Sequence, residues 1–353
     1  MSCPTDDRPL WERVRALPIT IETCTATGLV LDTNSGFQRH TTELHLSGAG
    51  HTGSGEDVTW DKDRQLELRG HVTGLDLGGA FTLESFSARL DETELWPTPP
   101  QDTAWRDYRR WAFESAALDL ALRQNGLGLE ETLGTGLAPV HFGVSLGLHD
   151  FEPVAQRLAM HADMRFKLDA TPDWSAELCA RLAETGAVDV VDFKGAYAGT
   201  PVDVVADPAL YARVLDALPD VIVEDPHDEP GVLALLRERG ARVSWDAPIH
   251  SLADVDRMPL PAAALNIKPS RFGPLQRLFE TYDGCRTRGL PAYGGGQFEL
   301  GVGRRQVQLL AGLFHADGPN DVAPRGYHQL DLDEERPASP LRLALPAAGF
   351  DLV

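Results

Sequence analysis

Five polar residues in the second half of the chain each follow a short apolar run, and their types suit a metal site. They are Asp192 in VVDFKGAY, Glu224 in VIVEDP, Asp246 in VSWDAP, Lys268 in LNIKPSRFG and Glu299 in GGGQFELG. Carboxylate oxygens are the hard ligands that Mg²⁺ takes in proteins, and a lysine would place an ammonium group beside the metal. The set therefore predicts a metal-dependent enzyme.

The spacing of these residues indicates which elements carry them. Successive members lie 32, 22, 22 and 31 residues apart, and about 20 to 35 residues suits one strand and one helix of a (β/α)₈ barrel. From residue 138 onward strand-like and helical segments alternate, with eight strand candidates, the last a weak one in HADGPND. This alternation predicts an α/β fold with a parallel sheet, and eight units favour a closed TIM-like barrel over an open sheet. Polar residues at the carboxyl ends of its strands would converge on one mouth.

The first part of the chain has a different pattern. Residues from about 18 to 60 look like antiparallel strands with a polar loop between them, and residues 103–125 carry apolar side chains at helical spacing. The stretch 61–102 looks strand-like and then becomes Pro-rich, which indicates a connection and not a third domain. An α+β unit is therefore expected before the barrel.

The composition argues against some classes of partner. Of the 353 residues 42% are hydrophobic, and the formal net charge is −21 at pH 7, whereas nucleic acids and anionic membranes bind cationic surfaces. A small carboxylate substrate fits better if the metal and the lysines reverse the local field. The four cysteines form no dense framework, the amino terminus lacks the features of a signal peptide, and no 18-residue apolar stretch exists. We expect a cytoplasmic protein, and symmetric homo-oligomers are common among such barrels.

Seven segments, in chain order, resemble the enolase superfamily in its muconate lactonizing enzyme subgroup. They are GHTGSGED, YRRWAFESAALDLALRQNGLGLEETLG, VEDP, SWDAP, NIKPSRFG, GGGQFELGVGR and ADGPND. The similarity points above all to o-succinylbenzoate synthases and N-acylamino acid racemases. It implies a barrel of seven or eight strands, an N-terminal α+β capping domain and Mg²⁺ bound between them. We expect the capping domain at 1–137, the barrel with its metal site at 138–325, and a segment at 326–353 that returns to the capping domain.

The resemblance also implies roles for the polar residues. Asp192, Glu224 and Asp246 would bind Mg²⁺, which stabilises the enediolate formed when a base removes the proton beside a substrate carboxylate. Elimination (dehydration) or isomerisation of a small carboxylic acid would follow. For each carboxylate alone, the alternative is a cap on the helix that follows its strand.

Two further residues of the set have open roles. Lys268 takes the place of the family's sixth-strand lysine, which serves as a base, an acid or an electrostatic stabiliser; the alternative is a solvated lysine in a turn. Glu299 would orient a ligand or buttress Lys268, or else be an acid at a helix start.

The second strand departs from the family. Relatives with proton-transfer activity carry Lys-x-Lys there, whereas this chain has FKLDATPDW. With Pro172 and Trp174 as anchors, Lys167 matches the first lysine and Asp169 falls on the second. The usual base is missing, which argues against racemisation by two opposed lysines.

Two residues could compensate for the missing lysine. Asp169 could itself be a base. Alternatively, Lys194 could pair with Asp169 across adjacent strands, because residues i and i+2 of a strand share a face and Lys194 lies two residues after Asp192. If neither holds, Lys194 is an exposed loop residue.

Two other functions stay open. A catalytically silent or ligand-binding relative would keep the metal ligands and lose a base. A barrel hydrolase would use Glu224 and Asp246 as an acid and a base without metal. His227 and His250 also end strands near the mouth, where a lone histidine is more often structural than catalytic.

In the family, substrate choice lies in two capping-domain loops, which correspond here to about 26–40 and 51–60. Phe37, Arg39 and His40 lie in the first loop and could meet a substrate. Each is more simply explained as loop surface or packing, so the sequence assigns no specificity.

Overall fold

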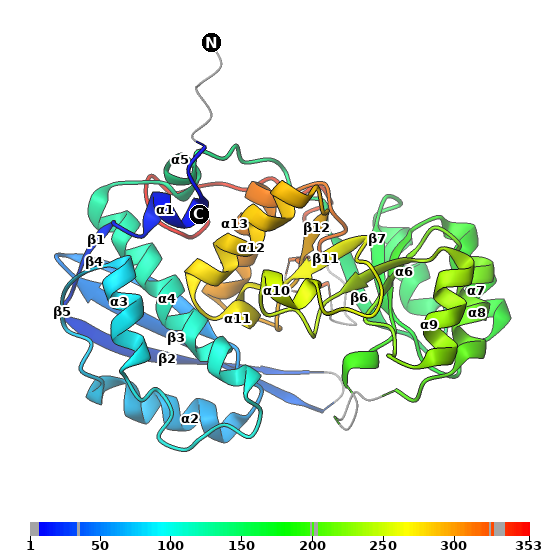
Figure 1. Cartoon of the computed structure of the whole chain (residues 1–353), viewed down its shortest axis with the longest axis horizontal. Coiled ribbons are helices and arrows are strands. Elements are labelled where there is room, and N and C mark those ends of the chain that lie inside the picture. The colour runs from blue at the N-terminus through cyan, green and yellow to red at the C-terminus, as the bar shows by residue number, and fades with distance from the viewer. Residues whose placement is uncertain (1–6, 34–35, 198–199, 201–203, 325, 328–335) are drawn as a thin grey trace, which may run out of the picture.

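The computed structural model describes residues 7–33, 36–197, 200, 204–324, 326–327 and 336–353. Its larger part is a parallel sheet in which each strand pairs with the next along the chain, with helices between strands (Figure 1). The strands are β6 (Gly143–Gly147), β7 (Arg165–Asp169), β8 (Val188–Asp192), β9 (Ile222–Glu224), β10 (Arg242–Trp245), β11 (Ala264–Ile267) and β12 (Ala292–Gly294). The predicted barrel architecture is confirmed.

The segment HADGPND, predicted as a weak eighth strand, instead joins the two edges of the sheet by single bridges. Asn320 forms an isolated bridge with Phe142, just before β6, and Asp321 forms one with Gly295, just after β12. The Asn320 side chain also accepts a backbone N–H of β12 at 2.7 Å. A longer strand is disfavoured because Pro319 has no N–H to donate to a neighbour.

The helices between the strands are α6 (Glu152–Met160), α7 (Ala176–Thr185), α8 (Pro208–Ala217), α9 (Pro230–Arg239), α10 (Leu252–Val255), α11 (Pro269–Phe272), α12 (Leu275–Arg288) and α13 (Val302–Phe314), with a short 3₁₀ turn η2 (Gly195–Tyr197). The Ser175 hydroxyl accepts an N–H at the start of α7, and left-handed Gly186, Gly240 and Gly289 end α7, α9 and α12. Among the described residues, no helix is long and apolar enough to span a membrane.

The amino-terminal part contains a three-stranded antiparallel sheet in the order β2-β3-β4 and a two-stranded sheet of β1 and β5. Its elements are α1 (Leu10–Val14), β1 (Pro18–Ile21), β2 (Thr23–Asp32), β3 (Gln38–Gly48), β4 (His51–Asp57), α2 (Lys62–His71), η1 (Val72–Gly74), β5 (Gly79–Thr82), α3 (Leu83–Asp91), α4 (Ala104–Asn125) and α5 (Leu129–Leu133). The long α4 approaches β4 closely because β4 carries glycines there. A Cβ on Gly53 would lie 2.2 Å from the Leu120 nitrogen.

The strand-like prediction for 61–102 was wrong for most of that stretch, which holds α2 and α3 as well as the short β5. Both helices begin at capping residues that the sequence displays. The Asp61 carboxylate accepts the Arg64 N–H at 3.0 Å, and Thr82 and Ser85 form a reciprocal capping box at the start of α3. These local signals outweigh the strand-like composition.

Polar contacts tie the capping domain to the loop before α13. The buried Arg39 guanidinium donates to the Val58 carbonyl at 2.7 Å in its own domain and to the Gln297 carbonyl at 2.8 Å in the barrel. Glu56 accepts the N–H groups of Leu300 at 2.6 Å and Gly303 at 2.9 Å, where α13 begins. The Arg39 side chain is thus buried and hydrogen-bonded to backbone carbonyls of both domains, and it is not exposed to a substrate.

The segment 326–353 lies only partly within the described residues. In its described part the Gly349 N–H donates to the Leu127 carbonyl at 2.9 Å, and the Phe350 N–H donates to Asp119 at 2.7 Å. These contacts lie at α4 and just after it. The exact boundaries of the three predicted regions stay a prediction.

Candidate active site

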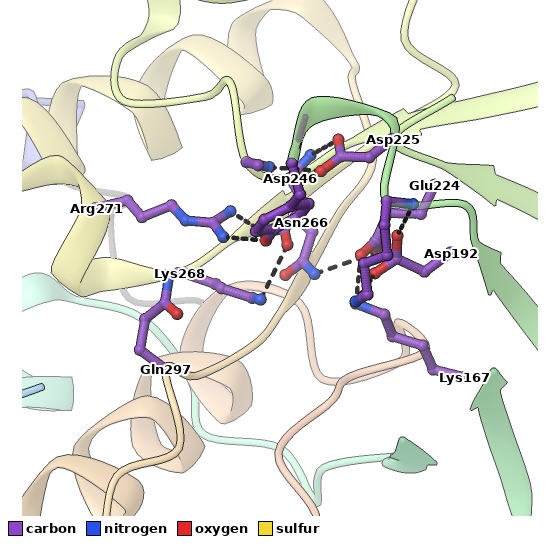
Figure 2. A network of polar contacts seen from close by, with 12 residues as sticks. Lys167, Asp192, Glu224, Asp225, Asp246, Asn266, Lys268, Arg271 and Gln297 are labelled. Atoms are coloured by element: carbon purple, nitrogen blue, oxygen red, sulfur yellow. Dashed lines mark hydrogen bonds and ion pairs between the residues drawn. The ribbon is translucent and has the colours of Figure 1, made fainter. Parts of the chain in front are cut away.

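Four of the five residues that the sequence singled out meet at one end of the parallel sheet (Figure 2). Asp192 and Glu224 are the last residues of β8 and β9, while Asp246 and Lys268 directly follow β10 and β11. All four are buried. Their common position follows from parallel strands, whose carboxyl ends share one edge.

Glu299 is placed differently from the prediction. It lies in the loop between β12 and α13, not on the seventh strand. Its carboxylate accepts the Gln297 N–H at 2.6 Å and lies 3.6 Å from Arg304. This arrangement orders the loop that docks on the capping domain, and it supports the alternative of an acid near a helix start.

Positively charged side chains lie between the buried carboxylates. Lys167 on β7 forms an ion pair with Glu224 and lies 3.5 Å from Asp192. Lys268 lies 2.9 Å from Asp246, which also accepts a hydrogen bond from Arg271. Figure 2 shows these cations pointing toward the carboxylates from the surrounding elements. Each predicted metal ligand therefore has a cationic partner.

Among the described residues, no three His, Cys, Asp or Glu side chains form a ready-made set of metal ligands. The interleaved cations account for this, because they hold the carboxylate oxygens in ion pairs. The donor chemistry nevertheless suits Mg²⁺, which takes hard carboxylate oxygens. Asp192 and Glu224 end β8 and β9, Asp246 directly follows β10, and all three are buried.

The electrostatics of the site show a surplus of buried negative charge. Burial and the neighbouring carboxylates raise the pKa of Glu224 to about 8 and that of Asp225 to about 7. By contrast, Arg271 and Lys268 outweigh burial and lower the pKa of Asp246. A divalent cation would relieve the repulsion that Glu224 and Asp225 feel, so the residues present fit such an ion.

The lysines of the site are held in their charged form. Burial alone lowers the pKa of Lys268, but the attraction of Asp246 outweighs burial and raises it. Burial also lowers the pKa of Lys167, but the attraction of the neighbouring carboxylates, Glu224 above all, outweighs burial and raises it. The resting site thus offers ammonium groups that attract or stabilise negative charge.

Lys194 and Asp169 form the pair that the sequence suggested, with a different backbone geometry. Lys194 Nζ lies 3.1 Å from Asp169 and 2.5 Å from Asp192. However, β8 ends at Asp192, and Lys194 has a left-handed backbone with φ of 56°. Strand alternation is therefore the wrong reason for the pairing. The Lys194 N–H donates to Asp192 at 3.0 Å, and this turn directs the side chain back to the carboxylates.

Several residues of the site were not singled out from the sequence. Asp225, next to Glu224, accepts the N–H groups of Asp246 at 2.7 Å and of Ala247 at 2.8 Å, and so fixes the loop after β10. Asn266 on β11 donates to Glu224 at 3.3 Å. The one sequence signal that could have indicated Asp225 is its position directly after the predicted metal ligand Glu224.

A second group of unpredicted residues surrounds Arg271. Its guanidinium donates to the Tyr197 hydroxyl at 2.8 Å, and the Gln297 amide oxygen, turned toward it, accepts from its Nε at 2.9 Å. Gln297 in turn lies 3.1 Å from the Tyr108 hydroxyl of α4. Tyr293 on β12 donates to Glu224. These residues come from distant parts of the chain, so no local pattern could have assembled them.

The remaining sequence candidates have structural contacts. The Tyr211 hydroxyl lies 2.8 Å from His227 Nδ1, and His250 Nδ1 lies 2.9 Å from the Arg271 carbonyl. His40 lies 2.7 Å from the Gln38 side chain. Phe37 is exposed and packs against Trp60, with ring centroids 6.1 Å apart. Residues 34–35 of the first capping loop lie outside the described residues.

A cavity of about 660 Å³ lies at the other end of the barrel. Its lining includes Arg165 and Val188 at the starts of β7 and β8, and Ile222 at the start of β9, but none of the buried carboxylates described above. The candidate chemistry therefore belongs to the carboxyl ends of the strands.

The fold is similar to that of solved enolase superfamily structures, with a barrel like that of muconate lactonizing enzyme. A muconate lactonizing enzyme structure superposes with a TM-score of 0.64 at 18% identity, covering 86% of this chain and 88% of that one. An enolase superfamily member from Enterococcus faecalis superposes with a TM-score of 0.65 at 21% identity, covering 86% of each chain. At such low sequence identity these superpositions show a similar fold and nothing about activity.

The chain belongs to the family described as "Domain of unknown function (DUF8230)", whose N-terminal and C-terminal domain models match residues 12–132 and 136–329. It is 31% identical to an N-succinylamino acid racemase from an Amycolatopsis species over 236 residues, which is 63% of this chain and 62% of that protein. An o-succinylbenzoate synthase from Geobacillus stearothermophilus is 27% identical over 62% of this chain and 59% of its own length. The chain thus matches about three fifths of the length of these curated relatives, both named as enzymes.

Proposed function

We propose that this protein is a Mg²⁺-dependent enzyme that removes a proton alpha to the carboxylate of a small acid, leading to elimination or isomerisation. The observation that carries the proposal is the buried Asp246–Lys268 pair beside Asp192 and Glu224, at the carboxyl ends of consecutive strands. The names of the curated relatives support a small carboxylate as substrate.

Asp192, Glu224 and Asp246 are the residues that would hold the metal. When bound, Mg²⁺ supplies positive charge that stabilises the enediolate form of the substrate. The protein contributes a buried site whose polar groups are held in fixed positions. Asp225 orders the backbone at Asp246, and Lys167 balances the charge of Glu224.

Lys268 is the residue best placed for proton transfer or charge stabilisation. Because Asp246 keeps its pKa raised, Lys268 rests as an ammonium group. In that form it donates a hydrogen bond to negative charge on the substrate, or returns a proton to it. For Lys268 to act as a base, Asp246 must first attract it less strongly.

Asp169 and Lys194 take the place of the missing second-strand lysine in this proposal. The Lys194 ammonium group supplies the cation, and Asp169 supplies a partly exposed carboxylate that can accept a proton. Their 3.1 Å contact supports a paired role. A single-lysine reaction, in which only Lys268 moves a proton, is the simpler version.

The decisive experiment is α-proton exchange in D₂O with Mg²⁺ and a panel of N-acylamino acids, dipeptides and acid sugars, followed by NMR. We expect exchange in the native chain and its loss in Lys268→Met. Lys62→Met, at an exposed position of α2, is the matched control and should keep it. Exchange that persists without Lys268 contradicts the assignment.

A second function is favoured by one specific observation, namely Asp169 at the position of a catalytic lysine. A ligand-binding relative that has lost turnover would bind Mg²⁺ and carboxylates without exchange. Binding by calorimetry with no exchange across the whole panel would support it. Activity that survives a chelator would instead favour a metal-free hydrolase that uses Glu224 and Asp246.

A reducing, cytoplasmic location completes the proposal. In the described part of the chain Cys24, Cys179 and Cys285 are free thiols, with Cys179 and Cys285 buried. Burial raises the pKa of Cys285 to about 11, which keeps that thiol protonated and unreactive. Cell fractionation with an antibody would test the location.

A further inference from the structure

The outer edge of β2 lacks the features that usually protect a free strand edge. β2 pairs with β3 along its whole length, from Thr23 with Ser47 to Asp32 with Gln38, without a bulge, and no other described strand pairs with it (Figure 1). All ten of its residues are partly or fully exposed. Charged residues, proline or bulges normally protect such edges, and residues 23–31 contain neither charge nor proline.

The other edge strand of the same sheet is protected. β4 is mostly buried, and the backbones of Gly53 and Gly55 lie directly against α4. At the start of β2 a cavity of about 280 Å³ separates residues 23–25 from the segment around Thr73–Gly78. The accessible part of the β2 edge is therefore centred on residues 26–31, where alternate backbone groups point away from β3.

We propose that this edge pairs with the β2 edge of a second copy of the chain, in antiparallel orientation, to form a homodimer with a continuous six-stranded sheet. A two-fold axis brings identical edges together, so the strand is its own partner. Each copy has one open edge in this sheet, so association stops at two copies. The inference is independent of the proposed catalytic function.

Charge explains why a second copy fits this edge. The chain carries a formal net charge of −21, so copies repel one another over most of their surface. Nine consecutive residues, 23–31, carry no charge of their own. The charged group that lies against them, at Gly28, is the Arg69 guanidinium, whose sign is opposite to the net charge of an approaching copy. Antiparallel pairing centred near Gly28 places Asp32 opposite residues 23–25 of the other copy, so the Asp32 carboxylates do not face each other.

The test compares two Val→Lys variants that add the same charge. Val30 on β2 is 50% exposed, whereas Val205 lies far from this sheet in sequence and is 81% exposed. Light scattering and sedimentation over a range of concentrations should show the native mass rising toward twice 38.5 kDa. Val30→Lys should weaken dimerisation by about tenfold or more, because each copy then carries a lysine within the uncharged edge that pairs, and an edge lysine opposes strand pairing. Val205→Lys should behave as the native chain.

Hydrogen–deuterium exchange of the native chain gives a second readout that needs no variant. Backbone amides within 26–31 should become more protected as concentration rises, because they gain partners in the dimer. The proposal is overturned if the native chain is monomeric at every concentration, if Val30→Lys folds and dimerises normally, or if a dimer forms without protection of 26–31. Circular dichroism verifies that both variants are folded.

Discussion

The mouth of the barrel holds two lysine–carboxylate pairs that share their chemistry and differ in their support. The side chains of Lys268 and Asp246 are 9% and 1% exposed, and Arg271 binds the same carboxylate. Those of Lys194 and Asp169 are 19% and 32% exposed. The first pair is fixed in a buried network, whereas the second is partly exposed at the strand ends.

This difference separates two requirements of an active site, which are a charge held in a fixed position and a charge that can adjust to the substrate. A buried ion pair needs further partners, because removal of charge from water costs several kcal/mol per ion. Asp246 meets this need with Lys268 and Arg271, while Asp225 accepts the backbone N–H of Asp246 and so orders its loop. Lys194 instead adopts a left-handed backbone to reach its carboxylates. We therefore expect the Lys268–Asp246 pair, after β10 and β11, to be held rigidly. We expect the Lys194–Asp169 pair, at the ends of β7 and β8, to adjust its contacts to the substrate.

The largest effect should come from removing the charge of the fixed pair. Lys268→Met should lower the rate of α-proton exchange by about 10²- to 10⁴-fold, the usual contribution of a positioned acid or base. Steady-state kinetics on an active substrate measures this. Lys194→Met should cost less, and a larger loss there would reverse the proposed order of the two pairs.

Stability should distinguish the two carboxylates. Asp246→Asn leaves Lys268 and Arg271 without their buried partner and should cost about 3–5 kcal/mol of unfolding free energy at pH 7. The folded pKa of Asp246, about 2, lies below the ordinary value of 3.8. The charged form therefore stabilises the fold above pH 4, and this contribution is lost as pH falls toward 2.

Asp169 should behave in the opposite sense. Burial raises its folded pKa above 3.8, so its ionisation costs stability as pH rises through the raised value. Asp169→Asn should be neutral or stabilising at pH 7 and lose that advantage at low pH. Urea unfolding of both variants at pH 7 and pH 3 measures the contrast. Equal destabilisation by the two substitutions at pH 7 would contradict it.

Metal binding should relieve the surplus negative charge between the two pairs. Mg²⁺ at about 100 times its Kd should add about 2.7 kcal/mol of stability. Asp192→Asn and Glu224→Gln should lose this gain, while Asp150→Asn, at an exposed position before α6, should keep it. Thermal unfolding with and without Mg²⁺ gives the answer. A shift that survives both ligand substitutions argues against this site.

The smallest expected loss of turnover concerns the Lys194–Asp169 pair. Lys194→Met should lower turnover by about 10- to 100-fold, as expected for a residue that orients its neighbours. Lys194→Arg keeps the positive charge and should recover much of the loss. If Lys194→Met leaves both turnover and Mg²⁺ affinity unchanged, the pairing with Asp169 has no role in function.

Local pattern predicted much of the barrel. Apolar runs followed by polar residues located β8 to β11 and their terminal Asp192, Glu224, Asp246 and Lys268, because strand periodicity and strand ends are local properties. The prediction failed at 61–102, where capping residues and not composition decide the structure. It also misplaced Glu299, since β12 ends at Gly294 and Glu299 lies in the following loop, which contacts the capping domain.

The sequence by itself determined which residue types follow each strand, and its resemblance to the superfamily predicted Asp169 at the position of a lysine. Only the tertiary structure decided how these charges are partnered. Lys167 on β7 reaches Glu224 on β9 with β8 between them, because side chains on the inner face of a curved sheet converge. Gln297 likewise meets Tyr108 from the capping domain, 189 residues away in the chain. Such pairings depend on barrel curvature and domain contact, which no local spacing encodes.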